Sequence, residues 1–207
     1  MDRRIEQIQR NRKNRISKRA ILVSYEGKNK TEDIYLGNYN GRDNNYVIRK
    51  VPGNDTDPIS LVEHTIARVK EESLDLTGDD RAFCMFDTDV KPEKNSQISE
   101  AIRLAKENNI IPIVSAPCVE VWFLLHYRYS TAQYSSNDEV IEELKKHCAG
   151  YNKSYDIYPL ICNNTNKAII NAKRLEKFQL ENGRILQTVE TNPYTEVYKI
   201  IEEIQKN

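Results

Sequence analysis

The sequence predicts an α/β protein with a mainly parallel sheet of about four strands, flanked by helices. Three observations support this class. Between residues 20 and 126, short apolar segments alternate with amphipathic ones. The apolar segments are rich in Ile, Val and Phe, which is typical of strands buried on both faces. After about residue 130 the pattern is polar and helical instead, so we expect a helical cap on the α/β core.

The strands and helices of the first half follow one another in strict alternation. The predicted strands lie at residues 20–27, 44–51, 81–86 and 110–115, and the predicted helices at 29–39, 58–72, 96–108 and 117–126. Asn29 followed by Glu32 is a capping signature, and Pro58 is suited to the first turn of a helix. Pro112 indicates an edge or irregular position, because proline has no N–H to donate.

The second half contains three further predicted helices, at residues 137–147, 164–181 and 192–205, with an aromatic connector at 151–160. We therefore divide the chain into a basic N-terminal arm (1–19), an α/β core (20–128) and a helical C-terminal subdomain (129–207) that packs on the core.

Composition narrows the class of protein. The 207 residues are 39% hydrophobic and 30% charged, with a mean hydropathy of −0.71 and no net charge. No apolar segment approaches the roughly 18 residues of a membrane span, and the basic N-terminus lacks the apolar centre of a secretory signal. We expect a cytoplasmic protein.

The four cysteines and three histidines show no metal or redox spacing, which favours reduced thiols.

The N-terminal arm is strongly basic and allows three interpretations. It could contact nucleic-acid phosphates, dock a partner, or form a solvated helix on which Ile5, Ile8 and Ile16 share a face. Within the first twenty residues, two acidic side chains stand against eight basic ones: Arg3, Arg4, Arg10, Arg12, Lys13, Arg15, Lys18 and Arg19.

Acidic residues follow three of the predicted strands. Glu26 ends the first, Asp87 and Asp89 follow the third, and Glu120 lies shortly after the fourth. In an open parallel sheet, ligands bind beyond the carboxyl ends of the strands, so these four side chains should meet at one edge. Residues i and i+2 of an extended chain lie roughly 6.6 Å apart and point the same way, so Asp87 and Asp89 could grip one Mg²⁺ or Mn²⁺.

Alternatives remain for each acidic residue. Asp87 and Asp89 could form a solvated Asx-type turn. Glu32 could cap a helix, and Glu120 could bind either helix amides or a metal. Unpaired carboxylates raise one another's pKa, so a cation must compensate them. The basic residues that could contribute to this compensation are Lys28, Lys91 and Lys153.

Several segments together resemble the RloB-like proteins, relatives of the AbiLii abortive-infection proteins. They are SYEGKNKTEDIYL, CMFDTD, SAPCVEVWFLLH, YNK, AIINAKRLE and NPYTEV, which occur in this order from about residue 20 to 203. The resemblance implies a Toprim-like core in which Glu26, Asp87 and Asp89 bind Mg²⁺ for phosphoryl transfer, with Glu120 assigned by weaker analogy. The loop from Glu26 to Glu32 is longer here than in relatives.

The resemblance also implies a role in phage defence or restriction loci, with an AAA-type ATPase encoded nearby. The leading hypothesis is a metal-dependent nuclease acting on RNA, including tRNA, or on DNA. Glu26 would complete a second metal site or act as general base, and Lys153 or Lys28 would stabilise the developing phosphorane charge. The alternatives are a non-catalytic nucleotide- or nucleic-acid-binding module that signals to the ATPase, and a scaffold that docks a basic surface.

Overall fold

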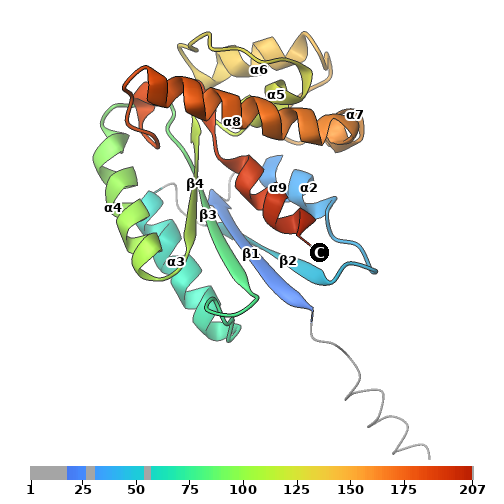
Figure 1. Cartoon of the computed structure of the whole chain (residues 1–207), viewed down its shortest axis with the longest axis vertical. Helices are drawn as coiled ribbons and strands as arrows, with labels where there is room; N and C mark the ends of the chain where they lie inside the picture. The colour runs from blue at the N-terminus through green and yellow to red at the C-terminus, as the bar shows by residue number, and fades with distance from the viewer. Residues whose placement is uncertain (1–17, 27–30, 54–56, 207) are drawn as a thin grey trace, which may run out of the picture.

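A single mixed sheet forms the centre of the molecule (Figure 1). The computed structural model describes residues 18–26, 31–53 and 57–206. Within them the strand order is β2-β1-β3-β4-β5, with β5 antiparallel to β4 and the other pairs parallel. The strands are β1 (Arg19–Glu26), β2 (Tyr46–Gly53), β3 (Arg81–Asp87), β4 (Ile111–Ala116) and β5 (Tyr194–Thr195). The predicted α/β class and the four predicted strands are confirmed.

Helices cover both faces of the sheet. One face carries α3 (Pro58–Glu71) and α4 (Lys94–Glu107), and the other carries α2 (Thr31–Gly37), α5 (Glu120–Tyr127), α8 (Thr165–Glu181) and α9 (Val197–Gln205). The remaining helical elements are α6 (Asn137–Lys145), α7 (Tyr158–Ile161), η1 (Cys162–Asn164) and η2 (Val189–Thr191). In Figure 1, α5, α6 and α8 lie beyond the ends towards which β1, β3 and β4 run.

Strand β3 shows why the apolar segments are continuous. Cys84 and Phe86 belong to the core between the sheet and α3/α4, whereas Phe83 and Met85 belong to the core on the opposite face. Successive side chains of a strand point to opposite faces, and here both faces are buried. The same alternation determines which face of the sheet the side chains at the end of each strand point towards.

The C-terminal segment differs from its prediction at one end. We expected a helix over 192–205, but Tyr194 and Thr195 form β5 and the helix begins at Val197. The two-residue strand forms because Ser115 and Ala116 of β4 offer a free edge, and the Ser115 and Thr195 hydroxyls are hydrogen-bonded at 2.9 Å. Pairing with a distant strand therefore overrides local helical periodicity.

Two expectations fall outside the described part of the chain. The proposed contacts of the basic arm concern residues 1–17, and the predicted cap residue Asn29 lies within 27–30; neither range is described. At the end of the arm, Arg19 is described, and its guanidinium forms an ion pair of 2.5 Å with Glu203 on α9. No helix within the described ranges is long and apolar enough to cross a membrane.

Candidate active site at the carboxyl edge of the sheet

Glu26 and Asp87 end two neighbouring strands. Strands β1 and β3 pair in parallel with Ser24 opposite Cys84, and extending this register by two residues places Glu26 beside Phe86, directly before Asp87. Neighbouring strands lie about 4.8 Å apart, so the backbones of the two acidic residues are close. The side chains nevertheless leave the sheet on opposite faces. Asp87 shares the alternation of Phe83 and Met85 and so points towards α2 and α5, whereas Glu26 shares that of Leu22 and points towards α4.

Three carboxylates gather on the α2/α5 side, and we call Glu32, Asp87 and Glu120 the inner group. Burial raises the pKa of Asp87 well above its ordinary value, and among neighbouring charges those of Glu32 and Glu120 contribute most. Burial likewise raises the pKa of Glu32 to about 8, with Glu120 and Glu26 adding to the rise. Glu120 begins α5, is 1% exposed and accepts a hydrogen bond from the Tyr151 hydroxyl at 3.0 Å.

The inner group is poorly compensated. Glu32 is 6% exposed, and its Oε2 has no hydrogen-bond partner among the described residues. Across the same ranges, no salt bridge reaches Glu32, Asp87 or Glu120. Buried charges of one sign without a counter-ion oppose folding, so this region favours either protonation or a bound cation.

The α4 side carries a second set, the outer group, made of Glu26, Asp89 and Lys94. Lys94 Nζ lies 2.6 Å from Asp89 Oδ2 and 3.9 Å from Glu26 Oε1. Asn137, at the start of α6, donates a hydrogen bond of 2.6 Å to the other Asp89 oxygen. Burial alone would raise the pKa of Asp89, but the contacts with Lys94 and Asn137 outweigh it and lower the pKa. Burial raises the pKa of Glu26, with Lys94 opposing the rise.

A strained turn separates the two groups. Thr88 and Asp89 continue the pairing with β4 and the residue that follows it, donating backbone hydrogen bonds of 3.0 Å to the Ser115 and Pro117 oxygens. Asp89 and Val90 then adopt φ of +54° and +52°. Two consecutive non-glycine residues in this left-handed region are energetically unfavourable, and such strain concentrates at functional sites. Asp89 is held by Lys94 and Asn137, and Asp87 is half-buried at the end of β3, so neither side chain is freely solvated.

Comparison with known sequences identifies the family. The family description "RloB-like protein" matches residues 21–204, which is most of the chain. The protein is a member of the RloB-like family. No curated protein and no solved structure matches this chain. Membership fits a defence role or one associated with restriction-modification.

Of the three lysines expected at the site of this RloB-like protein, Lys91 and Lys153 lie in the described part of the chain. Lys153 lies in the loop after α6, where its backbone oxygen accepts a hydrogen bond of 3.2 Å from Thr31, and its charge lowers the pKa of both Glu26 and Glu32. Lys91 lies in the turn after Asp89, and its charge lowers the pKa of Glu26. Neither contacts a carboxylate directly among the described ion pairs. Lys28 lies outside the described residues.

Sequence reasoning missed three residues that contact the carboxylates: Lys94, Asn137 and Tyr151. Lys94 carried one usable signal, since a basic residue in the first turn of a helix opposes the helix dipole and therefore suggests another reason for its position. Asn137 and Tyr151 lie about 50 and 30 residues from their partners along the chain, and no local pattern marks them.

The donor set of this RloB-like protein fits a hard divalent cation. All five acidic side chains offer oxygen ligands, which Mg²⁺ and Mn²⁺ prefer. Besides Glu32 Oε2, buried Glu26 Oε1 has no hydrogen-bond partner within the described ranges. In the described arrangement, however, no three acidic, histidine or cysteine side chains lie close enough together to hold a metal ion. Binding would require the carboxylates to close around the ion, whose charge would offset their mutual repulsion.

The cysteines of this RloB-like protein lie apart from one another in the described chain. Cys84, Cys118 and Cys148 are buried and Cys162 is half-buried, and none of the four forms a disulfide in the described chain. Burial, followed by the charges of Glu120 and Asp87, raises the pKa of Cys118 well above its ordinary value. Its thiol therefore stays protonated beside the inner group.

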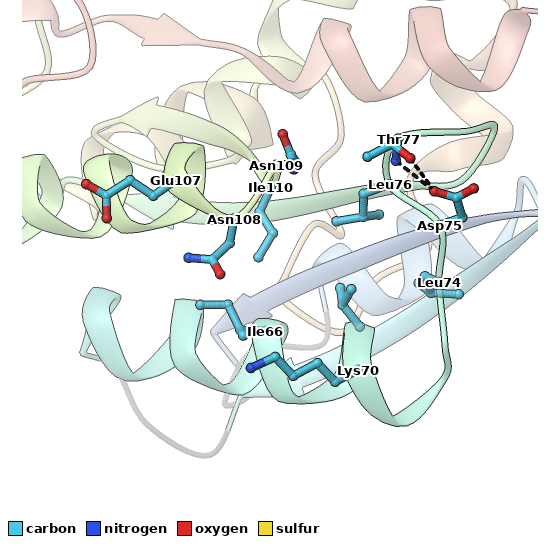
Figure 2. Close-up of a pocket in the computed structure, with 11 residues that line it drawn as sticks. Ile66, Lys70, Leu74, Asp75, Leu76, Thr77, Glu107, Asn108, Asn109 and Ile110 are labelled. Carbon is cyan, nitrogen blue, oxygen red and sulfur yellow. Dashed lines mark hydrogen bonds between the residues drawn. The ribbon is translucent and has the colours of Figure 1, made fainter.

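A separate pocket lies at the opposite edge of the sheet (Figure 2). It encloses about 360 Å³ between α3, α4 and the loop before β3, and shares no residue with the acidic groups. In this loop the Asp75 carboxylate accepts hydrogen bonds from the Thr77 backbone and hydroxyl, at 3.1 and 2.7 Å. The pocket is lined by Ile66, Val69, Lys70, Leu74, Asp75, Leu76, Thr77, Glu107, Asn108, Asn109 and Ile110. These residues precede β3 and β4, so the pocket faces away from the carboxyl edge.

Proposed function

We propose that this RloB-like protein is a metal-dependent nuclease of the Toprim type, which hydrolyses phosphodiester bonds of RNA or DNA in anti-phage defence. The observation that supports it most is the inner group, in which buried Glu32 and Glu120 and half-buried Asp87 form no salt bridge among the described residues. Natural folds tolerate such a cluster mainly where a ligand compensates it. A cation that also binds phosphate would be such a ligand.

The residues would have distinct roles. Glu32, Asp87 and Glu120 would hold the cation, with Glu26 and Asp89 available for a second ion. Bound Mg²⁺ or Mn²⁺ supplies charge neutralisation at the phosphate and lowers the pKa of a bound water.

Two further side chains would act on the substrate itself. As the alternative to binding the second ion, Glu26, whose pKa burial raises, would accept a proton as the general base. Lys153 would stabilise negative charge on the phosphate oxygens as a point cation.

The substrate class and the partner belong to this proposal as well. Phosphodiester chemistry is shared by RNA, including tRNA, and by DNA, so a screen must contain both. We also propose that an AAA-type ATPase is the functional partner and that the protein acts in the cytoplasm. The competing function is a non-catalytic module that uses the same acidic edge to bind a nucleotide or nucleic acid and signals to the ATPase.

A cleavage screen tests the nuclease directly. Wild type, Asp87→Asn and Asp79→Asn would be incubated with RNA and DNA pools in Mg²⁺ or Mn²⁺, with and without the ATPase. Asp79 is an exposed carboxylate just before β3, at the opposite end of the strand from Asp87. We expect cleavage by wild type and Asp79→Asn, and a loss of at least about a hundredfold in Asp87→Asn, in the range for removing a catalytic group.

Other outcomes would decide against the nuclease. If wild type cleaves neither pool under any combination, the nuclease assignment is wrong. If metal-dependent nucleic-acid binding persists without cleavage and is lost in Asp87→Asn, the binding module is the better description.

A further inference from the structure

Lys94 occupies a position that a cation at the outer group would also need. Its Nζ lies 2.6 Å from Asp89 Oδ2, 3.3 Å from the Asp87 backbone oxygen and 3.9 Å from Glu26 Oε1. The side chain is only 13% exposed. The ammonium group is therefore enclosed by oxygens from the ends of two neighbouring strands.

The local structure does not account for a lysine at this place. Lys94 is the first residue of α4, where the helix dipole favours acidic side chains over basic ones. It also carries a long apolar stem that must be ordered at an entropic cost to bring its charge inward. Its contacts with Asp89 and Glu26 offset both penalties. These two carboxylates therefore account for the inward position of the Lys94 side chain.

Lys94 also differs from the other lysines near the site. In the described part of the chain, it alone has a nitrogen within 4.0 Å of a carboxylate oxygen of the inner or outer group. Lys91 is exposed on the preceding turn and Lys153 lies in the loop after α6, and both act on these carboxylates only at longer range. The contact is specific to Lys94.

We propose that Lys94 is an intramolecular counter-ion, which neutralises Asp89 and Glu26 in the metal-free protein and competes with a divalent cation for them. The inference rests on the proposed function, because Glu26 and Asp89 are the residues that it leaves for a second metal ion. An ammonium group and a divalent ion about 4 Å apart repel each other even in water. A metal that binds Asp89 must therefore displace Lys94, and the metal affinity of the protein is lowered by this competition.

Calorimetric titration with Mn²⁺ tests the competition without measuring cleavage. We expect Lys94→Met to bind Mn²⁺ about tenfold more tightly than wild type, because the repulsion is removed. Lys94→Arg keeps the charge and should stay close to wild type. Lys91→Met removes a nearby charge that makes no direct contact, and should change the affinity by less than about threefold.

Thermal unfolding gives an independent measurement. In EDTA, Lys94→Met should unfold several degrees below wild type, because Asp89 and Glu26 lose their counter-ion, whereas Lys91→Met should not. With saturating Mn²⁺ the rise in melting temperature should be larger for Lys94→Met than for wild type. Should Lys94→Met not fold, Lys94→Gln, which keeps a hydrogen-bond donor near Asp89, serves for both measurements.

The possible failures are distinguishable. Unchanged or weaker Mn²⁺ binding by Lys94→Met, alongside clear binding by wild type, would overturn the counter-ion role and leave the proposed metal site standing. Absence of Mn²⁺ binding in every variant would contradict the metal site itself, and the competition with it. Binding by Lys94→Met alone would support the competition in its strongest form.

Discussion

Individual side chains at the carboxyl edge differ in how their charge is compensated. Asp89 has both oxygens engaged, by Lys94 and Asn137. Glu32 is almost fully buried, with one oxygen unpartnered among the described residues. Both residues carry a carboxylate, but their environments differ. The pKa of Glu32 is raised and that of Asp89 is lowered. Carboxylates of one cluster with pKa values shifted in opposite directions are typical of sites that bind ions or transfer protons.

Buried His126 should make the protein sensitive to acid. It is fully buried in α5, with Nδ1 2.9 Å from the Trp122 backbone oxygen. Burial lowers its pKa from 6.5 to about 4. The unfolded chain therefore takes up a proton that the folded chain excludes, so stability is lost as the pH falls from about 6.5 to 4.

The His126→Leu variant isolates this effect. Between pH 7.5 and pH 4, wild type should lose about 3 kcal/mol more free energy of unfolding than His126→Leu, as a shift of this size predicts. Urea unfolding across the pH series measures the difference. Parallel pH dependences for the two proteins would show that His126 does not control acid sensitivity.

At the scale of elements, β5 and α9 are attached to the sheet through Glu196. This residue lies between the two elements and is 1% exposed. Its carboxylate accepts hydrogen bonds from the Val114 backbone at 3.0 Å and from Gln187 at 2.8 Å, and its own N–H donates to the Val114 oxygen at 3.0 Å. A side chain thus continues the sheet pairing beyond the two residues of β5.

We predict that Glu196→Ala destabilises the protein by about 1 to 3 kcal/mol, because the buried Val114 N–H loses its acceptor. Glu202→Ala is the matched control on α9. Glu202 forms an exposed ion pair of 2.5 Å with Lys173, so its loss should cost less than about 0.5 kcal/mol. Denaturant unfolding compares the two variants. Equal effects would mean that Glu196 does not anchor the C-terminal elements.

For the whole molecule, the inner group predicts a conflict between stability and function. Glu32 has a pKa of about 8 in the folded chain, above that of an ordinary glutamate. Its charge therefore destabilises the folded state progressively as the pH rises from about 4.5 to 8. Without a cation, the molecule carries this penalty at neutral pH.

The Glu32→Gln substitution should remove this destabilisation of the folded state. We predict that the metal-free variant is more stable than wild type by about 1 to 3 kcal/mol at pH 8.5, while the stabilisation by Mg²⁺ is reduced or lost. Thermal unfolding with and without Mg²⁺ measures both effects, with Glu100→Gln on the exposed side of α4 as control. A Glu32→Gln protein that is less stable than wild type, yet equally stabilised by Mg²⁺, would contradict the proposed role of Glu32.

Much of the fold is predictable from local patterns. The four longer strands and the helices between them are visible in apolar runs and helical periodicity, because each element buries a face of its own. Strand β5 has only two residues and no pattern, since it exists through its pairing with Ser115 and Ala116. The approach of Asn137 to Asp89 is equally invisible, because it depends on how α6 packs.

The sequence by itself determined that this is an α/β protein whose strands β1 and β3 end in carboxylates at one edge. Only the tertiary structure decided how these carboxylates are grouped. Strand alternation sends Asp87 and Glu26 to opposite faces of the sheet, and the left-handed turn at Asp89 and Val90 directs Asp89 towards Lys94. Position along the chain places these carboxylates at the same end of the sheet. The direction in which each side chain leaves the backbone decides which charged groups it interacts with.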